Sequence, residues 1–288
     1  MPIIDAHLHL GRRPWFDQSA AACGDVNTLE FVQSTLARCG VAAAVAMGSG
    51  EPLTGSPSDC LMDLDGLYPD EGCPAPFWTC AGVSFESLRD DTARVMEHLQ
   101  RCARLPRVAG FKLYPGYQHF YVSDPVLEPL YDLAADTGLP VVTHTGDTVS
   151  PRGKVKYSHP LTVDDAAADH PKVRFVLAHM GYPWFADAAE VVYKNENVFA
   201  DLSGLAEGHF SPETFLVANG ALMDYLVMWL GTAGWDKVMY GTDWPLVRME
   251  DYLELMRLVV PTRWHDDFFY RNALRVFPRL GAALGQQP

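Results

Sequence analysis

The sequence predicts a single α/β domain folded as a (β/α)8 barrel. Short apolar runs rich in Val, Ile, Phe and Ala alternate with longer amphipathic stretches, which is the pattern of strand–helix units around a buried parallel sheet. The chain has 288 residues, 48% of them hydrophobic, so its length allows either one large barrel or two ordinary domains. Eight strand–helix units fit this length and favour the barrel. A doubly wound open sheet is the alternative, but no Gly-x-Gly-x-x-Gly motif follows any predicted strand.

Each unit is marked by an apolar run and, in most cases, by an amphipathic stretch after it. We expect strands at residues 3–6, 41–47, 77–83, 108–113, 140–143, 173–178, 198–201 and 237–240. Helices are expected at residues 29–38, 86–104, 125–136, 183–194, 212–230 and 249–258. Two of these helices begin with a capping side chain before a proline, at Ser123-Asp124-Pro125 and at Ser211-Pro212.

Long loops follow several of the predicted strands, at residues 48–76, 114–124, 145–160 and 203–211. In a parallel barrel these loops all open on the face at the C-terminal ends of the strands, where such barrels carry their chemistry. No low-complexity segment or linker interrupts the chain. We therefore expect residues 1–288 to form one domain with extended loops at its functional face.

The charge of the chain argues against nucleic acid and membranes as partners. Its 22 Lys and Arg residues against 36 Asp and Glu residues give a formal net charge of −14, whereas binding to a phosphate backbone needs clustered cations. No uninterrupted apolar stretch of about 18 residues is present, and the N-terminus lacks the basic and apolar segments of a signal peptide. We expect a cytoplasmic protein with a small-molecule substrate, and the sequence leaves open whether it forms a homo-oligomer.

The six cysteines lie in the first 102 residues and show no Cys-x-x-Cys spacing. Free buried thiols in a reducing compartment are the expected state. Disulfides or a thiolate zinc site around the loop that holds Cys60 and Cys73 are the alternative, but that loop has no metal-ligand pattern. The cysteines therefore predict no chemistry.

Four histidines and one aspartate stand at the C-terminal ends of predicted strands. His7 and His9 continue the first strand and point to the same side, because strand side chains alternate with a period of two. His144, His179 and Asp243 follow the fifth, sixth and eighth strands. Ordinary hydrogen bonding would explain any one of these residues, but a barrel brings all five to one mouth. The set predicts a divalent-metal site, with zinc favoured and manganese, iron or cobalt as alternatives.

These motifs resemble those of the amidohydrolase superfamily. They are most similar to its branch of TIM-barrel metal-dependent hydrolases, which includes aminocarboxymuconate-semialdehyde decarboxylase and related lactonases and hydratases. The resemblance covers nearly the whole chain, through Ile4-Asp5-Ala6-His7-Leu8-His9, Gly110-Phe111-Lys112-Leu113-Tyr114-Pro115, Thr143-His144, Leu177-Ala178-His179-Met180-Gly181, Gly241-Thr242-Asp243-Trp244-Pro245 and Asn272-Ala273-Leu274-Arg275-Val276-Phe277.

The resemblance implies that His7, His9, His144 and Asp243 are metal ligands. It implies that His179 lies near the ion, either as a further ligand or as a group that transfers a proton or polarises the substrate. Asp243 would also accept a proton from a water that the ion activates, because a divalent ion lowers the pKa of such a water to roughly 7.

Lys112 bears on the number of ions. In two-metal members of the superfamily a lysine at the end of the fourth strand is carboxylated and bridges the ions, and Lys112 matches that position. The alternative is an ammonium group that pairs with an acidic neighbour or holds a substrate carboxylate. The resemblance favours one ion over two.

Cationic and aromatic residues in the loops at the functional face are candidates for binding substrate. Arg12 and Arg152 belong to clusters of cations on an otherwise acidic chain, and an arginine fork fits a carboxylate. Tyr114, His119, Trp184 and Trp244 follow strand ends and could wall a planar or apolar ligand. Solvated loop charges and packed aromatic rings are the alternatives.

The leading hypothesis is a metal-dependent hydrolase that cleaves an amide, lactone or ester-like bond in a small, carboxylate-bearing molecule, with Asp243 and His179 as catalytic residues. The second hypothesis is a non-oxidative decarboxylase or hydratase of a small unsaturated or aromatic acid, because the same metal centre serves both. A binding barrel without catalysis is disfavoured, because all five site positions hold chemically competent residues.

Overall fold

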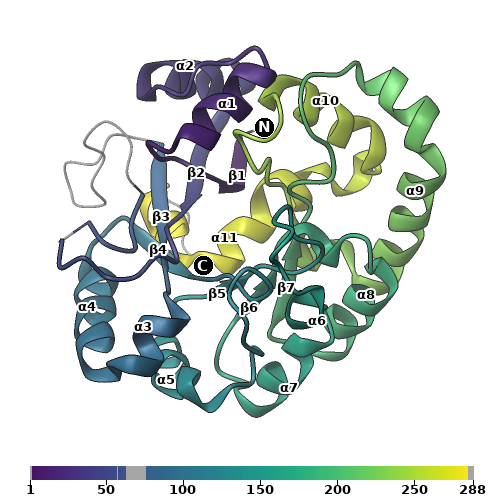
Figure 1. Ribbon diagram of the computed structural model, residues 1–288. Helices are drawn as coiled ribbons and strands as arrows, with labels where there is room; N and C mark the ends of the chain where they lie inside the picture. The colour runs from purple at the N-terminus through teal and green to yellow at the C-terminus, as the bar shows by residue number, and fades with distance from the viewer. Residues whose placement is uncertain (1, 57, 63–75, 285–288) are drawn as a thin grey trace.

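The computed structural model describes residues 2–56, 58–62 and 76–284, and it confirms the predicted barrel. Eight strands follow one another in the order of the chain, and every neighbouring pair from β1 to β8 is parallel. In Figure 1 the helices form a ring around these strands. The strands are β1 (Ile3–Leu8), β2 (Val41–Met47), β3 (Phe77–Gly82), β4 (Val108–Leu113), β5 (Val141–Thr143), β6 (Phe175–Leu177), β7 (Val198–Asp201) and β8 (Val238–Met239).

Backbone hydrogen bonds close the barrel between the first and last strands. The amide of Ala6 donates to the carbonyl of Tyr240 at 2.9 Å, and the amide of Asp243 donates to the carbonyl of His7 at 2.8 Å. The buried carboxyl of Asp5 adds to this seam, because it accepts from the Thr242 hydroxyl at 2.7 Å. The seam therefore places the His-x-His segment directly beside the segment that carries Asp243.

The outer layer is mostly helical, and two departures from the predicted helices have local causes. The predicted helix at 86–104 is divided at Asp91, whose side chain accepts from the amide of Arg94 and so caps a new helix. The two helices after β5 were not predicted, because they are short, with four and eight residues. The α-helices are α1 (Pro14–Ala22), α2 (Leu29–Cys39), α3 (Phe85–Asp90), α4 (Thr92–Arg104), α5 (Glu128–Thr137), α6 (Val155–Ser158), α7 (Thr162–Asp169), α8 (Phe185–Lys194), α9 (Pro212–Ala233), α10 (Met249–Val259), α11 (Asn272–Val276) and α12 (Pro278–Ala283).

Short helical turns join these elements. They are 3-10 turns at Pro125–Leu127, Ala178–Gly181, Trp235–Lys237 and Thr262–Trp264, and a π-helical turn at Asp267–Arg271.

Apolar side chains pack in two layers on the two sides of the strands. Outward-facing strand residues pack against the helices, and inward-facing residues such as Ile4, Val45 and Val142 fill the barrel. Phe277 and Leu280, from the end of the chain, belong to the same inner cluster. The C-terminal helices therefore close the barrel at the end opposite its mouth, and in Figure 1 the yellow α11 lies within the ring of outer helices. The loops at the C-terminal ends of the strands therefore form the functional face.

The described cysteines and the most apolar helix both bear on the expectations from the sequence. Cys23, Cys39, Cys60, Cys80 and Cys102 are free thiols, and Cys73 lies outside the described residues. Among the described helices, α9 alone has the length and hydropathy of a membrane span. It packs against α8 and α10 and buries Met223, Leu226 and Leu230, as an outer barrel helix does.

We predict that Asn272→Ala lowers the free energy of unfolding by about 2–4 kcal/mol. The buried Asn272 amide donates at 2.7 Å to the carbonyls of both Trp235 and Val238 and so ties α11 to the segment entering β8. Its removal leaves two buried acceptors without that donor. Urea denaturation measures the change. Asn219→Ala, which removes a bond to one carbonyl on a half-buried helix face, is the control, and an equal loss in both variants would contradict the assignment.

Candidate metal centre

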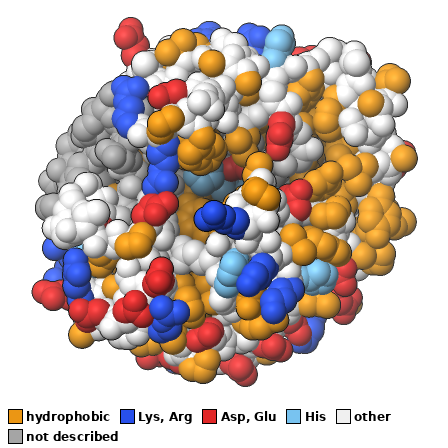
Figure 2. Space-filling model, in the orientation of Figure 1, with side chains coloured by type: hydrophobic (Ala, Val, Ile, Leu, Met, Phe, Trp, Pro, Cys, Tyr) orange, Lys and Arg blue, Asp and Glu red, His pale blue; other side chains and the backbone are white. Residues whose placement is uncertain are grey.

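The carboxyl ends of five strands meet at the mouth of the barrel and carry the candidate site. His7 lies in β1, Asp201 ends β7, and His144, His179 and Asp243 closely follow β5, β6 and β8. Figure 2 looks onto a central hollow in which a histidine is visible, with Lys and Arg side chains at its edge. The fold thus brings together the residues that the sequence predicted would converge, and adds Asp201 to them.

Three ligand atoms lie together at the seam between β1 and β8. Asp243 Oδ1 is 3.1 Å from His9 Nε2 and 3.6 Å from His7 Nε2. These three residues can place one ligand atom each within 4.8 Å of one another. This spacing suits a set of ligands that surround one ion.

Two of those atoms are buried polar groups without a hydrogen-bond partner. His7 Nε2 and Asp243 Oδ1 both lack one, and so does Lys112 Nζ, which is buried in the barrel interior at the end of β4. Buried polar atoms in native proteins nearly always have a hydrogen-bond partner, so atoms without one indicate that a bound group supplies the partner. Two imidazoles and a carboxylate are donors that divalent metals accept. The residues present therefore fit a metal ion.

The backbone is strained at two residues of the site. His179 and Asp243 have φ values of 63° and 67°, in the left-handed region that residues other than glycine rarely adopt. Met180, next to His179, has a φ of 47°. Strain of this kind persists only where the surrounding structure holds it, and it concentrates at functional sites. Nothing in the sequence pattern indicated it.

Burial and charge set the protonation states that a metal site needs. Burial lowers the pKa of His7, His144 and His179, which keeps these imidazoles neutral at pH 7. Burial alone would raise the pKa of Asp243. The neighbouring His179, His9 and His7 lower it by more, so this pKa lies well below its ordinary value. Neutral imidazoles and an ionised carboxylate are the forms that bind metals.

His144 lies beside the three-atom cluster but is not one of its members. Its ring is 5.1 Å from that of His179 and 4.8 Å from that of Tyr117, and its Nε2 is 2.9 Å from the Asp147 carbonyl oxygen. Its Nε2 is thus engaged with the backbone, so binding a metal would need its Nδ1 or a turn of the ring. That His144 is a ligand stays a prediction.

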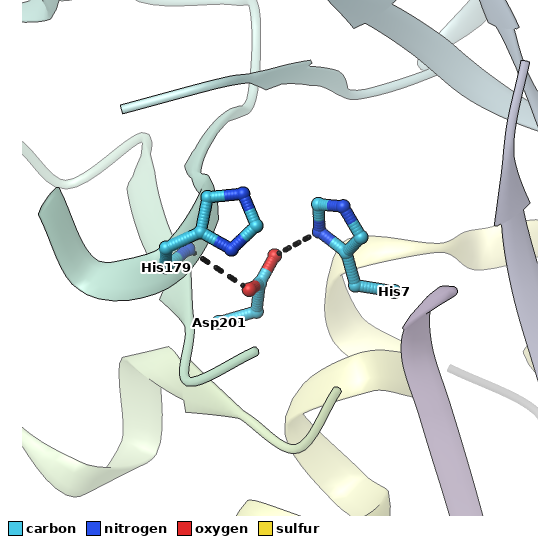
Figure 3. A group of neighbouring side chains, drawn as sticks. All are labelled: His7, His179 and Asp201. Carbon is cyan, nitrogen blue, oxygen red and sulfur yellow. Dashed lines mark hydrogen bonds and ion pairs between the residues drawn. The ribbon is translucent and has the colours of Figure 1, made fainter. Parts of the chain in front are cut away.

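Asp201 is the residue of the site that the sequence reasoning missed. Its Oδ2 is 2.9 Å from His7 Nδ1, and its Oδ1 accepts from the His179 amide at 3.1 Å (Figure 3). The pKa of Asp201 is held well below its ordinary value: burial would raise it, but His7 outweighs that effect. The sequence did contain a signal for Asp201, because it is a carboxylate at the end of the seventh predicted strand. The same strand-end position identified His144, His179 and Asp243.

A family model described as Amidohydrolase matches residues 4–279. The chain belongs to the amidohydrolase family. It is therefore an enzyme of a metal-dependent superfamily, as the motifs predicted. No curated protein matches the chain.

Solved structures resemble this amidohydrolase in fold at low sequence identity. A 2,6-dihydroxybenzoate decarboxylase from Rhizobium has a TM-score of 0.65 at 14% identity, covering 96% of this chain and 99% of the other. A probable 2-pyrone-4,6-dicarboxylic acid hydrolase from Acinetobacter baumannii has a TM-score of 0.60 at 13% identity, covering 96% and 100%. A 5-carboxyvanillate decarboxylase from Novosphingobium aromaticivorans, complexed with manganese, has a TM-score of 0.61 at 15% identity, covering 96% of each chain.

Lys112 places a buried cation at the end of β4. It is fully buried, with Nζ 5.2 Å from the centre of the Tyr114 ring, and burial lowers its pKa to about 8. Tyr114 itself donates from its hydroxyl to the Gly48 carbonyl at 2.6 Å.

The predicted cations of the loops lie further out. Arg12 is exposed and donates to the Asn27 carbonyl at 3.0 Å. Arg152 is also exposed, and its carbonyl oxygen is 3.1 Å from Nε2 of the exposed His119. These three residues belong to the outer rim of the amidohydrolase, so their contact with substrate stays a prediction.

The two predicted tryptophans occupy different environments. Trp184 is half-buried, and its ring is 5.0 Å from that of His159. Trp244 is 0% exposed, and its indole N–H donates to Asp25 at 3.1 Å. Complete burial with a satisfied N–H favours a packing role for Trp244, which anchors the turn that carries Asp243.

We predict that the purified amidohydrolase carries about one divalent ion per chain and that His7→Ala and Asp243→Ala lose it. Each substitution removes one of the three clustered ligand atoms. Elemental analysis by plasma mass spectrometry measures the content. The control is His170→Ala, whose ring lies near Glu128 on the outer layer. Full metal content in both site variants would contradict the assignment.

We predict that Gly204→Ala weakens metal binding by about tenfold or more. Gly204 has a φ of +67°, and an added Cβ would lie 2.9 Å from Asp243 Oδ2 and 3.0 Å from His179 Nδ1. Gly208→Ala is the matched control, because its φ is +80° and its Cβ would meet nothing within 4 Å. Both variants carry the backbone penalty, and only the first crowds the site. Equal metal affinities in titrations of the two variants would contradict this prediction.

Proposed function

We propose that this enzyme is a metal-dependent hydrolase that activates water to cleave an amide, lactone or ester-like bond in a small molecule bearing a carboxylate. The observation that carries the proposal is the group of unsatisfied atoms at the barrel mouth, where His7 Nε2 and Asp243 Oδ1 lie 3.6 Å apart. A divalent ion held there supplies Lewis acidity and a water whose pKa is lowered to roughly 7.

The residues of the chain have separate tasks in this proposal. His7, His9 and Asp243 hold the ion, and His144 is proposed to complete the set. Asp243 also accepts the proton that the attacking water loses, because its carboxylate stays ionised. His179, neutral and packed against His7 at a ring distance of 4.9 Å, takes this proton from Asp243 and gives it to the leaving atom.

A single ion is favoured over two. Among the described residues, the groups of three potential ligands are His7, His9 and Asp243, and His7, His179 and Asp201. The ring nitrogens of the second group that face Asp201 already have partners, because His7 Nδ1 is 2.9 Å from Asp201 Oδ2 and His179 Nδ1 is 2.9 Å from Ser203 Oγ. Zinc suits the nitrogen-rich set, and the manganese in one structural relative makes that ion the main alternative.

Lys112 is proposed to bind the substrate carboxylate, in place of the loop arginines that the sequence suggested. Its ammonium is buried at the mouth without a hydrogen-bond partner, and a buried cation favours an anionic partner. The named substrates of the three structural relatives, a benzoate, a carboxyvanillate and a dicarboxylic acid, all carry carboxylates. An unmodified Lys112 also agrees with one ion, because it then has no ions to bridge.

Non-oxidative decarboxylation is the second candidate, and two structural relatives named as decarboxylases of aromatic acids favour it. A panel of aromatic acids, lactones and amides tests both candidates. Release of carbon dioxide without consumption of water identifies the decarboxylase, and ring opening or bond cleavage with uptake of one water identifies the hydrolase. No turnover of any member by the metal-loaded enzyme would count against both.

We predict that Lys112→Met raises KM for the carboxylate-bearing substrate by about tenfold or more, because a hydrogen bond to a charged group contributes roughly 1.5–3 kcal/mol. Lys154→Met, at an exposed rim position, is the control and leaves KM unchanged. Steady-state kinetics measure both. An unchanged KM in the Lys112 variant would remove this residue from the binding site.

We predict a fall in kcat/KM for that substrate as pH rises through about 8. Burial lowers the Lys112 pKa to about 8, so the ammonium is present below this pH and lost above it. The carboxylate then loses its cationic partner at high pH. A pH–rate profile measures the inflection, which should be absent in Lys112→Met and present in Lys154→Met.

A further inference from the structure

We propose that Asp201 and Ser203 set the tautomers of both His7 and His179, so that each ring turns an unprotonated Nε2 toward the metal centre. This inference deepens the proposed function and rests on it for its link to metal binding. The tautomers themselves follow from the hydrogen bonds of the fold.

His7 is hydrogen-bonded directly to Asp201. Its Nδ1 is 2.9 Å from Oδ2 of Asp201, and both side chains are buried. An ionised carboxylate can only accept a hydrogen bond, so His7 Nδ1 must carry the proton. The other nitrogen, Nε2, then holds a lone pair, and it is the atom without a hydrogen-bond partner 3.6 Å from Asp243 Oδ1.

His179 reaches the same carboxylate through Ser203. His179 Nδ1 is 3.1 Å from the Ser203 carbonyl oxygen and 2.9 Å from its Oγ. Because a carbonyl oxygen only accepts, Nδ1 is the protonated nitrogen here as well. The Ser203 hydroxyl is then free to donate to Asp201 Oδ1, which lies 2.5 Å away.

Both chains of hydrogen bonds therefore end on one carboxylate. Oδ2 of Asp201 takes the proton of His7, and Oδ1 takes the hydroxyl of Ser203 and the amides of His179 and Ser203. In Figure 3 the remaining nitrogen of each ring lies on the side away from Asp201. Asp201 is thus a positioning residue, whose contacts orient one metal ligand and one proton-transfer group together.

This network also argues against a second metal site between His7, His179 and Asp201, which lie within reach of one another. The hydrogen bonds described above already use the nitrogens that face Asp201. An ion between these residues would have to displace the proton from each ring. The same three residues support the first site.

The test combines histidine tautomers with Zn²⁺ affinity in the full-length enzyme. Two-bond proton–nitrogen spectra of protein labelled at its histidines report which ring nitrogen is protonated, with and without Zn²⁺, and His7→Gln and His179→Gln assign the signals. Titration against a chelating dye gives the Zn²⁺ dissociation constant. We expect Nδ1–H forms for both rings, and a loss of about 10–100-fold in Zn²⁺ affinity for Asp201→Asn.

Asp5→Asn is the matched control. Asp5 is a buried carboxyl, like Asp201, but it accepts from the His7 amide and from Thr242, and no hydrogen bond among the described residues joins it to the His7 ring. We expect this variant to keep both tautomers and to bind Zn²⁺ within about threefold of wild type. Ser203→Ala should leave both tautomers unchanged, because the backbone carbonyl of residue 203 still accepts from His179 Nδ1.

Three results would overturn the inference: an Nε2–H tautomer of His7 or of His179 in the wild type, unchanged tautomers and affinity in Asp201→Asn, or equal losses in Asp201→Asn and Asp5→Asn. If Asp201→Asn does not fold, the wild-type and Ser203→Ala spectra still decide. If the wild type binds no Zn²⁺, the proposed metal centre fails, whereas the spectra of the metal-free protein still test the tautomers.

Discussion

The site depends on the closure of the barrel between its first and last strands. His7 and Asp243 come from opposite ends of the chain, and the 2.8 Å bond from the Asp243 amide to the His7 carbonyl makes them neighbours. Asp5 reinforces the same seam from inside, where burial raises its pKa to about 7 although Thr242 and the His7 amide stabilise its charge. An open sheet of the same strands would leave the two ligands apart, so the fold is a precondition of the chemistry.

Several groups around this seam are in energetically unfavourable states, and favourable interactions elsewhere in the fold must offset them. The left-handed backbone of His179 and Asp243 costs on the order of 1–3 kcal/mol at each residue. Unsatisfied polar atoms of His7, Asp243 and Lys112 add to this cost. A bound cation would relieve the first two, and a substrate anion the third. The barrel mouth is therefore preorganised to bind both a cation and an anion.

Sequence patterns predicted the repeated strands and most of the strand-end residues of the site. They missed Asp201 and the details that depend on single long-range contacts. Strands β2, β4 and β7 were placed at their observed bounds, because parallel strands buried on both faces form continuous apolar runs. The strand-end rule found His144, His179 and Asp243, and the motif resemblance assigned their family. The same rule applied to Asp201 but lacked a motif to support it. The engagement of His144 Nε2 and the burial of Trp244 depend on contacts with residues distant in sequence, which no local pattern records.

The measurement that tests the metal assignment most directly is anomalous diffraction from crystals of the enzyme loaded with zinc or manganese. We expect one strong peak at the barrel mouth, about 2.0–2.2 Å from His7 Nε2, His9 Nε2 and an oxygen of Asp243, with Asp201 still bonded to His7 Nδ1. A peak between His7 Nδ1 and Asp201, or well-ordered crystals with no peak near these residues, would contradict it.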